Sequence, residues 1–267
     1  MTRPLDGTNK PLVALHKTFR DLAVTGQRLA TGLQINRAED DSAGFSISSK
    51  LQSRIRGLTQ GLDNAEMGLS RIDVANGAMD TVDDILGRAT ELAVQAGSDT
   101  VSDEQRAMLD SEMSGLLAEL DELHGGTSFN GEAVFGDDAG YEVLVDEGGE
   151  TIVVDGESVS AEALGLDGAS LADGDSARAA LESISDARDT MADARSRFNG
   201  SASQLRGARD YVNDSLISLA GANSRIADAD FAKESTELIR LQIVAKAGLA
   251  AIAHSNATRQ SVLNLVG

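Results

Sequence analysis

The sequence predicts a mainly α-helical fold: a long antiparallel helical bundle or coiled coil with a small β-hairpin insert, in which the N- and C-terminal helices are paired. Apolar residues recur at heptad spacing over long stretches, which is typical of helices packed along one another. Aromatic residues make up 3% of the chain and Trp is absent, so the core must be aliphatic. Strand-like alternation is confined to residues 127–175, where Gly and Asp also concentrate.

The longest heptad series lies within residues 177–226 and predicts one straight helix. Its members form the rod seam, an apolar residue at every seventh position: Ile184, Met191, Phe198, Leu205, Val212 and Leu219. A companion series three residues earlier includes Arg188, Arg195 and Arg209, which predicts a second edge that is partly basic. Asp175 or Ser176 is the expected N-cap of this helix. Since ordering the chain offsets most of the gain from burying one seam, the helix requires partner helices.

An amphipathic helix is predicted from Pro11 to about Thr31, because Pro suits the first helical turn and apolar residues follow at steps of three and four. These residues are Leu12, Leu15, Phe19, Leu22 and Leu29. After a break over residues 32–41, the apolar spacing predicts a second helix over residues 42–96. At 1.5 Å per residue it would be roughly 80 Å long, a length that globular enzymes rarely need.

A shorter third helix is predicted from Ser102 to about Leu123, with Ser102 and Gln105 as a capping box and two glycines as its stop. Alternation at residues 141–145 and again at 151–154, around turn-forming residues, predicts a β-hairpin. A last helix is predicted from about Lys233. It carries Leu238, Leu241 and Ile252 on its apolar face.

These elements predict three regions. Residues 1–35 and 231–267 form a terminal helical core domain, residues 42–124 and 175–226 form a helical rod domain, and residues 125–174 form the β-hairpin insert of the rod. Charge is also divided unequally along the chain. Residues 1–37 carry a net charge of +4 and residues 239–267 carry +3. Since the whole chain has a net charge of −20, the residues between them carry −27.

Composition excludes several classes of function. A net charge of −20 argues against nucleic acid and anionic membranes as partners. Cys is absent, so no disulfide or thiolate chemistry is possible. No uninterrupted run of 18 apolar residues is present, so stable membrane insertion is not expected, nor is a cleaved secretory signal. His16, His124 and His254 lie far apart, and no catalytic constellation, metal site or cofactor site is predicted.

Opposite charges repeat along the two longest predicted helices. Glu66, Asp73 and Asp80 recur every seven residues on the second helix, while the three arginines of the companion series lie on the rod helix. Either the two rows face each other and fix the register of an antiparallel pair, or both are solvated and contribute little. The sequence leaves both readings open.

Both ends of the chain are apolar, weakly basic helices joined by a short breaker to a long acidic one. A pair of such helices has more apolar surface than it can hide, so we expect copies of the chain to associate. Head-to-tail contacts that do not close into a ring produce a helical filament.

Five segments occur in an order that resembles bacterial flagellin: RLATGLQINRAEDDSAG at 28–44, ELAVQ at 91–95, TSFNG at 127–131, ALGL at 163–166 and SRIADADFAKE at 224–234. The resemblance covers residues 12–124 and 177–267 well and the insert loosely. It implies a structural subunit of the flagellar filament for swimming motility, in a short form without the family's large outer domains. It also implies an extracellular location after export without a cleaved signal peptide.

The resemblance implies partners and one surface patch. Expected partners are further copies of the chain, a flagellar export chaperone, the flagellar type III export apparatus, and the hook-associated junction and cap proteins. The family has a patch on its outer helices that packs between subunits and is read by an innate immune receptor. Arg88, Leu92 and Glu112 match this patch, whereas Gly87 and Thr90 replace residues common there.

Two other functions stay open from the sequence. A hook-filament junction protein shares the terminal helices, although the segments at 91–95 and 224–234 are closer to flagellin. A membrane-surface amphipathic protein could use the apolar helix that begins near Leu238. An enzyme is the least favoured class, because no acid, base or nucleophile is assembled.

Overall fold

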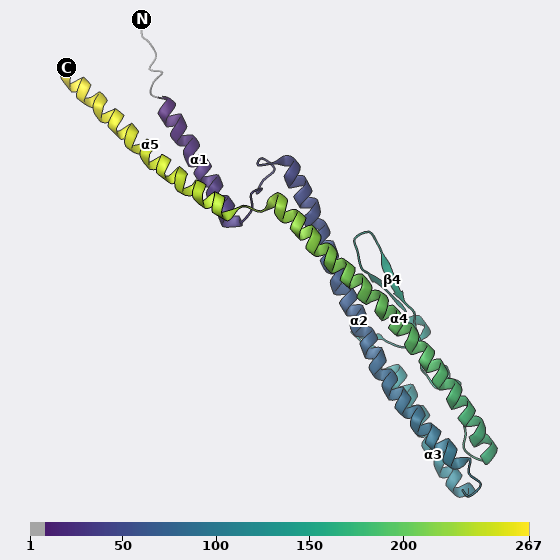
Figure 1. The fold of residues 1–267 in the computed structure, drawn as a ribbon. Helices are drawn as coiled ribbons and strands as arrows, with labels where there is room; N and C mark the ends of the chain where they lie inside the picture. Colours follow the sequence, from purple (N-terminus) through teal and green to yellow (C-terminus); the bar gives the residue numbers. More distant parts are fainter. Residues whose placement is uncertain (1–8, 267) are drawn as a thin grey trace. The chain divides into compact units, whose positions relative to one another are not determined.

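The structure is a computed structural model and describes residues 9–266 (Figure 1). Its helices are α1 (Asn9–Thr31), α2 (Ser42–Ala96), α3 (Asp103–Gly126), α4 (Gly174–Ala227) and α5 (Phe231–Val266). Its strands are β1 (Ser128–Phe129), β2 (Glu132–Ala133), β3 (Tyr141–Leu144) and β4 (Thr151–Val154), with a 3-10 turn, η1, at Asp137–Ala139. The predicted mainly α-helical fold with a small β-hairpin insert is therefore confirmed.

The chain forms two compact units. We call residues 1–55 and 218–267 the terminal unit, and residues 56–217 the central unit. The long helices α2 and α4 each contribute to both units. The three regions predicted from sequence have different bounds from these units and stay a prediction. Residues 1–8 and 267, which the predicted terminal domain includes, lie outside the described residues.

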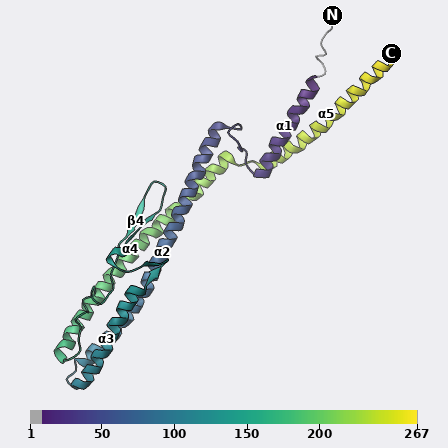
Figure 2. The same ribbon diagram turned by 180° about the vertical axis from the view of Figure 1, so that it is seen from behind.

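In the central unit, α2 and α4 run antiparallel and side by side, with α3 along them and the hairpin against them (Figures 1 and 2). From Ile72 onward the apolar face of α2 is almost completely buried, at 0–1% exposure for residues such as Met79, Leu86 and Ala93. The rod seam of α4 is buried from Ile184 to Val212, and Leu219 is half-buried. Heptad spacing thus identified the core-facing side of α4.

The predicted companion edge of α4 is only partly buried: Ala202 of that series is 1% exposed and Arg195 is half-buried. Arg188 is exposed, and the buried neighbours of the seam are alanines, including Ala187 and Ala194. Alanine lets the helix backbones approach closely, whereas a long guanidinium side chain must reach past the interface to water. Arg188 therefore lies outside the buried seam, whereas Arg195 reaches from α4 to Asp80 and Asp83 of α2.

The β-hairpin lies on a glycine-lined face of α2. Strands β3 and β4 pair antiparallel, with Tyr141 opposite Val154 and Leu144 opposite Thr151. A Cβ placed at Gly61 would lie 2.1 Å from the carbonyl oxygen of Val145, so only glycine permits this approach. The alternation at 141–145 therefore does place Val143 and Val145 in the core.

A second, shorter hairpin precedes it and was not predicted as strands. Strands β1 and β2 pair antiparallel around Asn130 and Gly131, whose φ values are 53° and 86°. Two successive positive φ values favour the Asn-Gly dipeptide at a two-residue hairpin turn. The dipeptide was visible in the sequence, but two-residue strands are too short to show alternation.

Side-chain caps explain where the helices begin. Ser102 and Gln105 form the predicted capping box of α3. At α4 the predicted cap is wrong, because Asp173 accepts the backbone N–H groups of Asp175 and Ser176 at 3.0 and 2.8 Å. At α5, the carboxylate of Asp230 accepts the N–H groups of Ala232 and Lys233, so this helix starts earlier than predicted. The third helix also continues through the two glycines to Gly126, three residues beyond its predicted end near Leu123.

In the terminal unit, α1 and α5 form an antiparallel pair (Figure 1). The segments that join them to the long helices bond to each other: Gln34 N–H donates to Ala227 at 2.7 Å, and Ala229 N–H donates to Gly32 at 2.8 Å. Gly32 has a φ of 72°, which suits glycine at a helix end. Ser48 and Asn223 also bond, at 2.8 Å.

Candidate assembly surfaces

The interface between α1 and α5 is narrow. Among the described side chains of these two helices, Leu241, Ala245, Thr25 and Glu234 are buried, at 4–8% exposure. A Cβ placed at Gly248 would lie 3.3 Å from Leu15 Cδ1, which shows that the helices approach closely there. Two helices alone can bury only the stripe along which they touch.

The eight terminal residues predicted from sequence therefore differ in burial. Leu241 is buried, and Leu12 and Phe19 are exposed at 48% and 45%. The other five are half-buried: Leu15, Leu22, Leu29, Leu238 and Ile252. The apolar faces of the two helices exist as predicted, but pairing within one chain does not cover them.

A second apolar surface lies outside the predicted faces. These residues are exposed by 42–64%: Val13, Val24, Ile239, Ile243, Val244 and Leu249. This surface was not predicted from the sequence, because only the apolar residues whose spacing places them on the face toward the partner helix were considered. The four-residue step from Ile239 to Ile243 was available as a signal. Large exposed apolar surfaces on a soluble chain mark sites of association.

Polar side chains join α1 and α5 where the two helices meet the rest of the terminal unit. Arg28 Nη1 donates to Glu234 Oε1 at 3.3 Å, and the Glu234 side chain is only 11% exposed. Beside this pair lies an open groove of about 910 Å³, whose lining includes Asp21, Asp230 and Lys233. Its polar lining makes it a surface for hydrated contacts.

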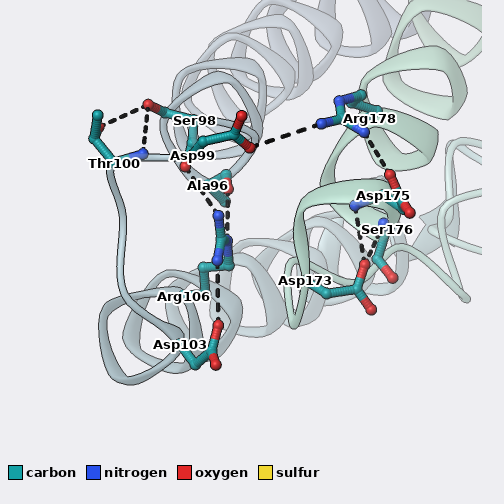
Figure 3. Close-up of polar contacts among 10 residues, drawn as sticks. All are labelled: Ala96, Ser98, Asp99, Thr100, Asp103, Arg106, Asp173, Asp175, Ser176 and Arg178. Atoms are coloured by element: carbon teal, nitrogen blue, oxygen red, sulfur yellow. Dashed lines mark hydrogen bonds and ion pairs between the residues drawn. The ribbon is translucent and has the colours of Figure 1, made fainter.

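Three helices of the central unit are tied together at one end (Figure 3). The buried guanidinium of Arg106 on α3 donates to the carbonyl oxygens of Ala96 and Ser98 at 2.9 Å each, which satisfies the carboxyl end of α2. Arg178 on α4 lies 4.0 Å from Asp99 and pairs with Asp175. At this end of the central unit, hydrogen bonds and ion pairs therefore connect the carboxyl end of α2 with α3 and with α4.

The Asp173 carboxylate belongs to the same end (Figure 3). The backbone N–H of Ser176, followed by further hydrogen bonds from Ser176 and Asp175, lowers the pKa of this group. A capping carboxylate at a helix N-terminus is stabilised in its charged form by these donors and by the helix dipole. The cap is therefore most effective when Asp173 is ionised.

The predicted surface patch is partly assembled. Arg88 on α2 donates to Glu112 on α3 at 2.6 Å and to Glu91 at 2.8 Å, and hydrogen bonds with Glu112 and Glu91 raise the pKa of Arg88. Arg88 and Glu112 are about half exposed, whereas Leu92 is 1% exposed and belongs to the core. Arg88 and Glu112 are therefore accessible to another molecule, whereas Leu92 is not.

One member of each predicted charge row comes together. Arg195 Nη2 lies 2.9 Å from Asp80 and 2.8 Å from Asp83, so an ion pair does cross from α4 to α2. Arg209 contacts its neighbour Asp210 instead. The charge rows therefore fix the register at one position at most.

Within the described residues, no group of three or more His, Cys, Asp or Glu could hold a metal ion.

Comparison with known proteins decides the family. Residues 9–139 match the bacterial flagellin N-terminal helical region, and residues 181–266 match the bacterial flagellin C-terminal helical region. Flagellin of Halalkalibacterium halodurans is 34% identical over 267 residues, covering 97% of this chain and 98% of that protein. The chain belongs to the bacterial flagellin family.

Other relatives and a solved structure agree. Flagellin of Bacillus subtilis is 31% identical, and the match covers 90% of this chain and 91% of that protein. The flagellar filament 33 kDa core protein of Treponema phagedenis is also 31% identical, with 90% of each chain covered. The crystal structure of Bacillus cereus flagellin has a TM-score of 0.50 and 25% identity, covering 57% of this chain and 88% of that one. The resemblance predicted from the five sequence segments is confirmed.

Helix α5 is long and apolar. By length and composition alone, Phe231–Val262 is apolar enough to cross a membrane, with a mean hydropathy of 1.2 over 18 residues. The segment has no uninterrupted apolar run of 18 residues, because polar residues such as Lys246 interrupt it, and the expectation that the chain does not insert stably into a membrane stays a prediction. In this helix, large apolar side chains such as Ile239 and Ile243 are exposed by 58% and 62%.

Proposed function

We infer that the chain is a structural subunit that polymerises into the bacterial flagellar filament, with the exposed apolar side chains of α1 and α5 forming contacts between copies. The observation that carries this contact assignment is the low burial of the terminal helix pair. Ile239, Ile243 and Leu249 are each at least half exposed. Burying such side chains against neighbouring copies would contribute about 1.5–3 kcal/mol each.

The proposed contact between copies joins two different surfaces of the chain. A surface on α1 and α5 that contacts a different surface on the next copy is heterologous, and heterologous contacts continue indefinitely unless the rotation closes a ring. The stiff central unit would then transmit torque passively. The flagellin family is structural, and we assign no catalytic step to this chain.

Deleting residues 240–267 tests this assignment. We expect a soluble protein whose central unit keeps its helices by circular dichroism, because that unit's core lies entirely within residues 56–217. It should not elongate sheared filament seeds, as followed by light scattering and electron microscopy. Normal filaments from the truncated chain would refute the assignment.

A milder variant tests the same surface without removing a helix. Ile239→Gln with Ile243→Gln should raise the critical concentration for seeded growth at least about tenfold, since two contacts of about 1 kcal/mol or more are lost. The matched control is Met67→Gln with Val74→Gln, two exposed apolar residues of α2. Equal effects of both variants would show that the contacts are not concentrated on α5.

The same exposed surface suggests what happens before assembly. We propose that an export chaperone covers α5 until the flagellar type III export apparatus passes the chain outward. We also propose that hook-associated junction and cap proteins contact the first and last copies through α1 and α5. The patch of Arg88 and Glu112 is proposed as a further contact between copies. Co-purification of the wild-type chain, but not the 240–267 deletion, with a cognate chaperone would support the first of these.

A further inference from the structure

Asparagine followed by glycine occurs three times in this chain, in two different backbone settings. Asn76-Gly77 lies inside α2 and Asn199-Gly200 lies inside α4, whereas Asn130-Gly131 forms the turn between β1 and β2. The dipeptide is chemically distinctive because the backbone nitrogen after an Asn can attack the side-chain amide, and glycine, without a Cβ, shields that nitrogen least. The two helical copies therefore serve as internal controls for the copy in the turn.

The turn leaves both reacting groups of Asn130-Gly131 unbound. Asn130 is exposed, and neither its side chain nor the Gly131 N–H has a hydrogen-bond partner among the described residues. The φ of Asn130 is 53°, a value that few residues other than glycine adopt, and the φ of Gly131 is 86°. A Cβ placed at Gly131 would have nothing within 4 Å, so the space around the nitrogen is open to water.

The two helical copies have the same open space but a bound nitrogen. A Cβ placed at Gly77 or at Gly200 would also have nothing within 4 Å. In a helix interior, however, the N–H of each glycine donates to the carbonyl oxygen four residues earlier. Asn76 Nδ2 also donates to Asn199 Oδ1 at 3.4 Å, which joins the two side chains across α2 and α4. The three sites therefore differ in the freedom of the backbone and not in the space around the glycine.

We propose that Asn130 is a site of spontaneous deamidation, in which the Gly131 nitrogen and water convert the side-chain amide to a carboxylate. The Gly131 nitrogen loses its proton to a base in the solvent and forms a bond to Asn130 Cγ. The bond between Cγ and Nδ2 then breaks, and Nδ2 takes up a proton and leaves as ammonia. The product is a five-membered succinimide ring, and its formation requires no oxidant, reductant or further protein. The reaction does not depend on the proposed function, because it needs only the folded chain and water.

Water opens the ring in one of two ways. Addition at Cγ breaks the bond from Cγ to the Gly131 nitrogen and yields an aspartate at position 130. Addition at the backbone carbonyl carbon of residue 130 breaks the original peptide bond and yields an isoaspartate, whose main chain runs through Cβ and Cγ. Both products carry a new carboxylate, and the isoaspartate also inserts one carbon into the main chain of a two-residue turn.

The hairpin is anchored on both sides of this turn. Before β1, Thr127 N–H donates to the carbonyl oxygen of Leu123 at 3.0 Å, and after β2, Val134 N–H donates to that of Thr127 at 3.1 Å. Arg71 on α2 also donates to the carbonyl oxygen of Ala133 at 2.6 Å. A change between these anchors alters the exposed tip and leaves the buried core in place. Modified molecules therefore stay folded, and the converted fraction rises with the age of the protein.

Incubation of the full chain at pH 8 and 37 °C, followed by peptide mass spectrometry, tests the proposal. Replacement of an amide by an acid changes the mass, so the three peptides report their own conversion. We expect conversion at Asn130 to be at least about tenfold faster than at Asn76 or Asn199, because a helix must open locally before its nitrogen can react. Equal rates at the three sites, or faster conversion inside a helix, would overturn the proposal.

The same incubation in 6 M urea shows whether the fold is the cause of the difference. Unfolding removes the helical hydrogen bonds of Gly77 and Gly200, so the three rates should converge. A preference for Asn130 that is equally large in urea would trace the difference to neighbouring side chains and overturn the structural assignment.

A pair of variants tests the ring mechanism. Asn130→Gln moves the amide one methylene away, so the ring would need six members, and conversion at this position should fall at least about tenfold. The matched control, Asn76→Gln, should leave conversion at Asn130 unchanged. Undiminished conversion in Asn130→Gln would indicate direct hydrolysis by water and would overturn the proposal.

The product provides an independent readout. Opening of the ring yields aspartate and isoaspartate, whereas direct hydrolysis of the amide yields aspartate alone. Labelling by a protein isoaspartate methyltransferase should therefore mark the peptide that contains position 130, and a peptide with aspartate alone would overturn the mechanism. Aged and fresh protein should melt within a few degrees of each other by circular dichroism. An early loss of the helical signal in aged protein would contradict a change confined to the turn.

Discussion

The central and terminal units are both built on paired long helices, yet they hide their apolar residues to very different degrees. In the central unit, residues such as Met79, Leu86 and Leu205 are completely buried. Among the described residues of the terminal unit, few apolar side chains are buried, Leu241 being one of them, while others such as Ile243 are exposed. The core of the central unit is therefore complete within one chain, and the proposed function has other chains complete the terminal unit.

The number of partners explains the contrast. Residues of α2, α3, α4 and the hairpin share one buried core, so the apolar stripe of each long helix is covered within the central unit. Helix α1 has α5 as its main partner. A helix that is apolar on more than one face needs further neighbours. Mutations should therefore separate the two units: core changes in the central unit affect folding, and changes in the terminal unit affect assembly.

Leu205→Ala should have the largest effect on folding. Leu205 lies at 0% exposure in the rod seam, and truncating a buried Leu to Ala costs about 2–5 kcal/mol. The matched change is Leu241→Ala in the terminal pair, which should lower thermal stability by less than half as much but abolish most seeded growth. Urea unfolding followed by circular dichroism measures the first effect. Equal loss of stability in both variants would contradict the comparison.

Gly61→Ala tests how closely the hairpin lies on α2. The new methyl group would meet the Val145 carbonyl, so the hairpin must shift, at a cost of about 1–3 kcal/mol. Gly77→Ala on the same helix is the control, because nothing lies within 4 Å of its added Cβ. That change should stabilise the chain by about 0.5–1 kcal/mol. Thermal melts of the two variants should therefore shift in opposite directions.

Arg106→Met tests the network that closes the central unit (Figure 3). The variant keeps most of the side-chain volume but leaves the carbonyl oxygens of Ala96 and Ser98 without this donor. Loss of a partner by buried polar groups costs about 1–3 kcal/mol. Hydrogen exchange at the α2 carboxyl end and the α3 amino end should rise more than exchange near Leu205. Uniform acceleration across the unit would mean that Arg106 supports global rather than local stability.

Much of this fold could be predicted because its helices are long and periodic. The rod seam and the face of α2 repeat often enough that tertiary context does not override them. The cap at Ser102 was visible as a local pattern. The physical patterns of the chain predict only that copies associate. The function as a flagellar filament subunit was predicted from the five segments that resemble flagellin.

The remaining details depend on contacts that spacing does not encode. The alanine edge of α4 was missed because small buried residues carry little hydropathy contrast, whereas the arginines three residues before the seam stood out. Leu92 was placed on a surface although it is only 1% exposed and belongs to the core. The bonds of Arg106 to α2 need a turn geometry that appears only after folding. Hydrogen-bond and packing partners of this kind cannot be predicted from the periodicity of the sequence.

The smallest predicted effect concerns pH at the start of α4. Hydrogen bonds from Ser176 and Asp175 lower the pKa of Asp173, so its ionised form is bound more tightly in the folded state. The stabilisation is present above the ordinary Asp pKa of about 4 and is lost as the pH falls through the lowered value. Asp173→Ala should therefore reduce the melting temperature by a few degrees at pH 7, and the difference from wild type should shrink toward pH 3.

Two variants make the pH test specific to the cap. Asp173→Asn keeps a side-chain oxygen that can accept the same N–H groups, so it should retain most of the stability at pH 7 and show no titration at this site. Asp167→Asn changes an exposed Asp in the preceding segment and should leave the melting temperature unchanged at both pH values. The central unit is closed by such local bonds, so weakening this cap should leave seeded growth intact at 25 °C. A loss of growth in Asp173→Ala without a matching loss of stability would show that this end of the unit also contacts other copies.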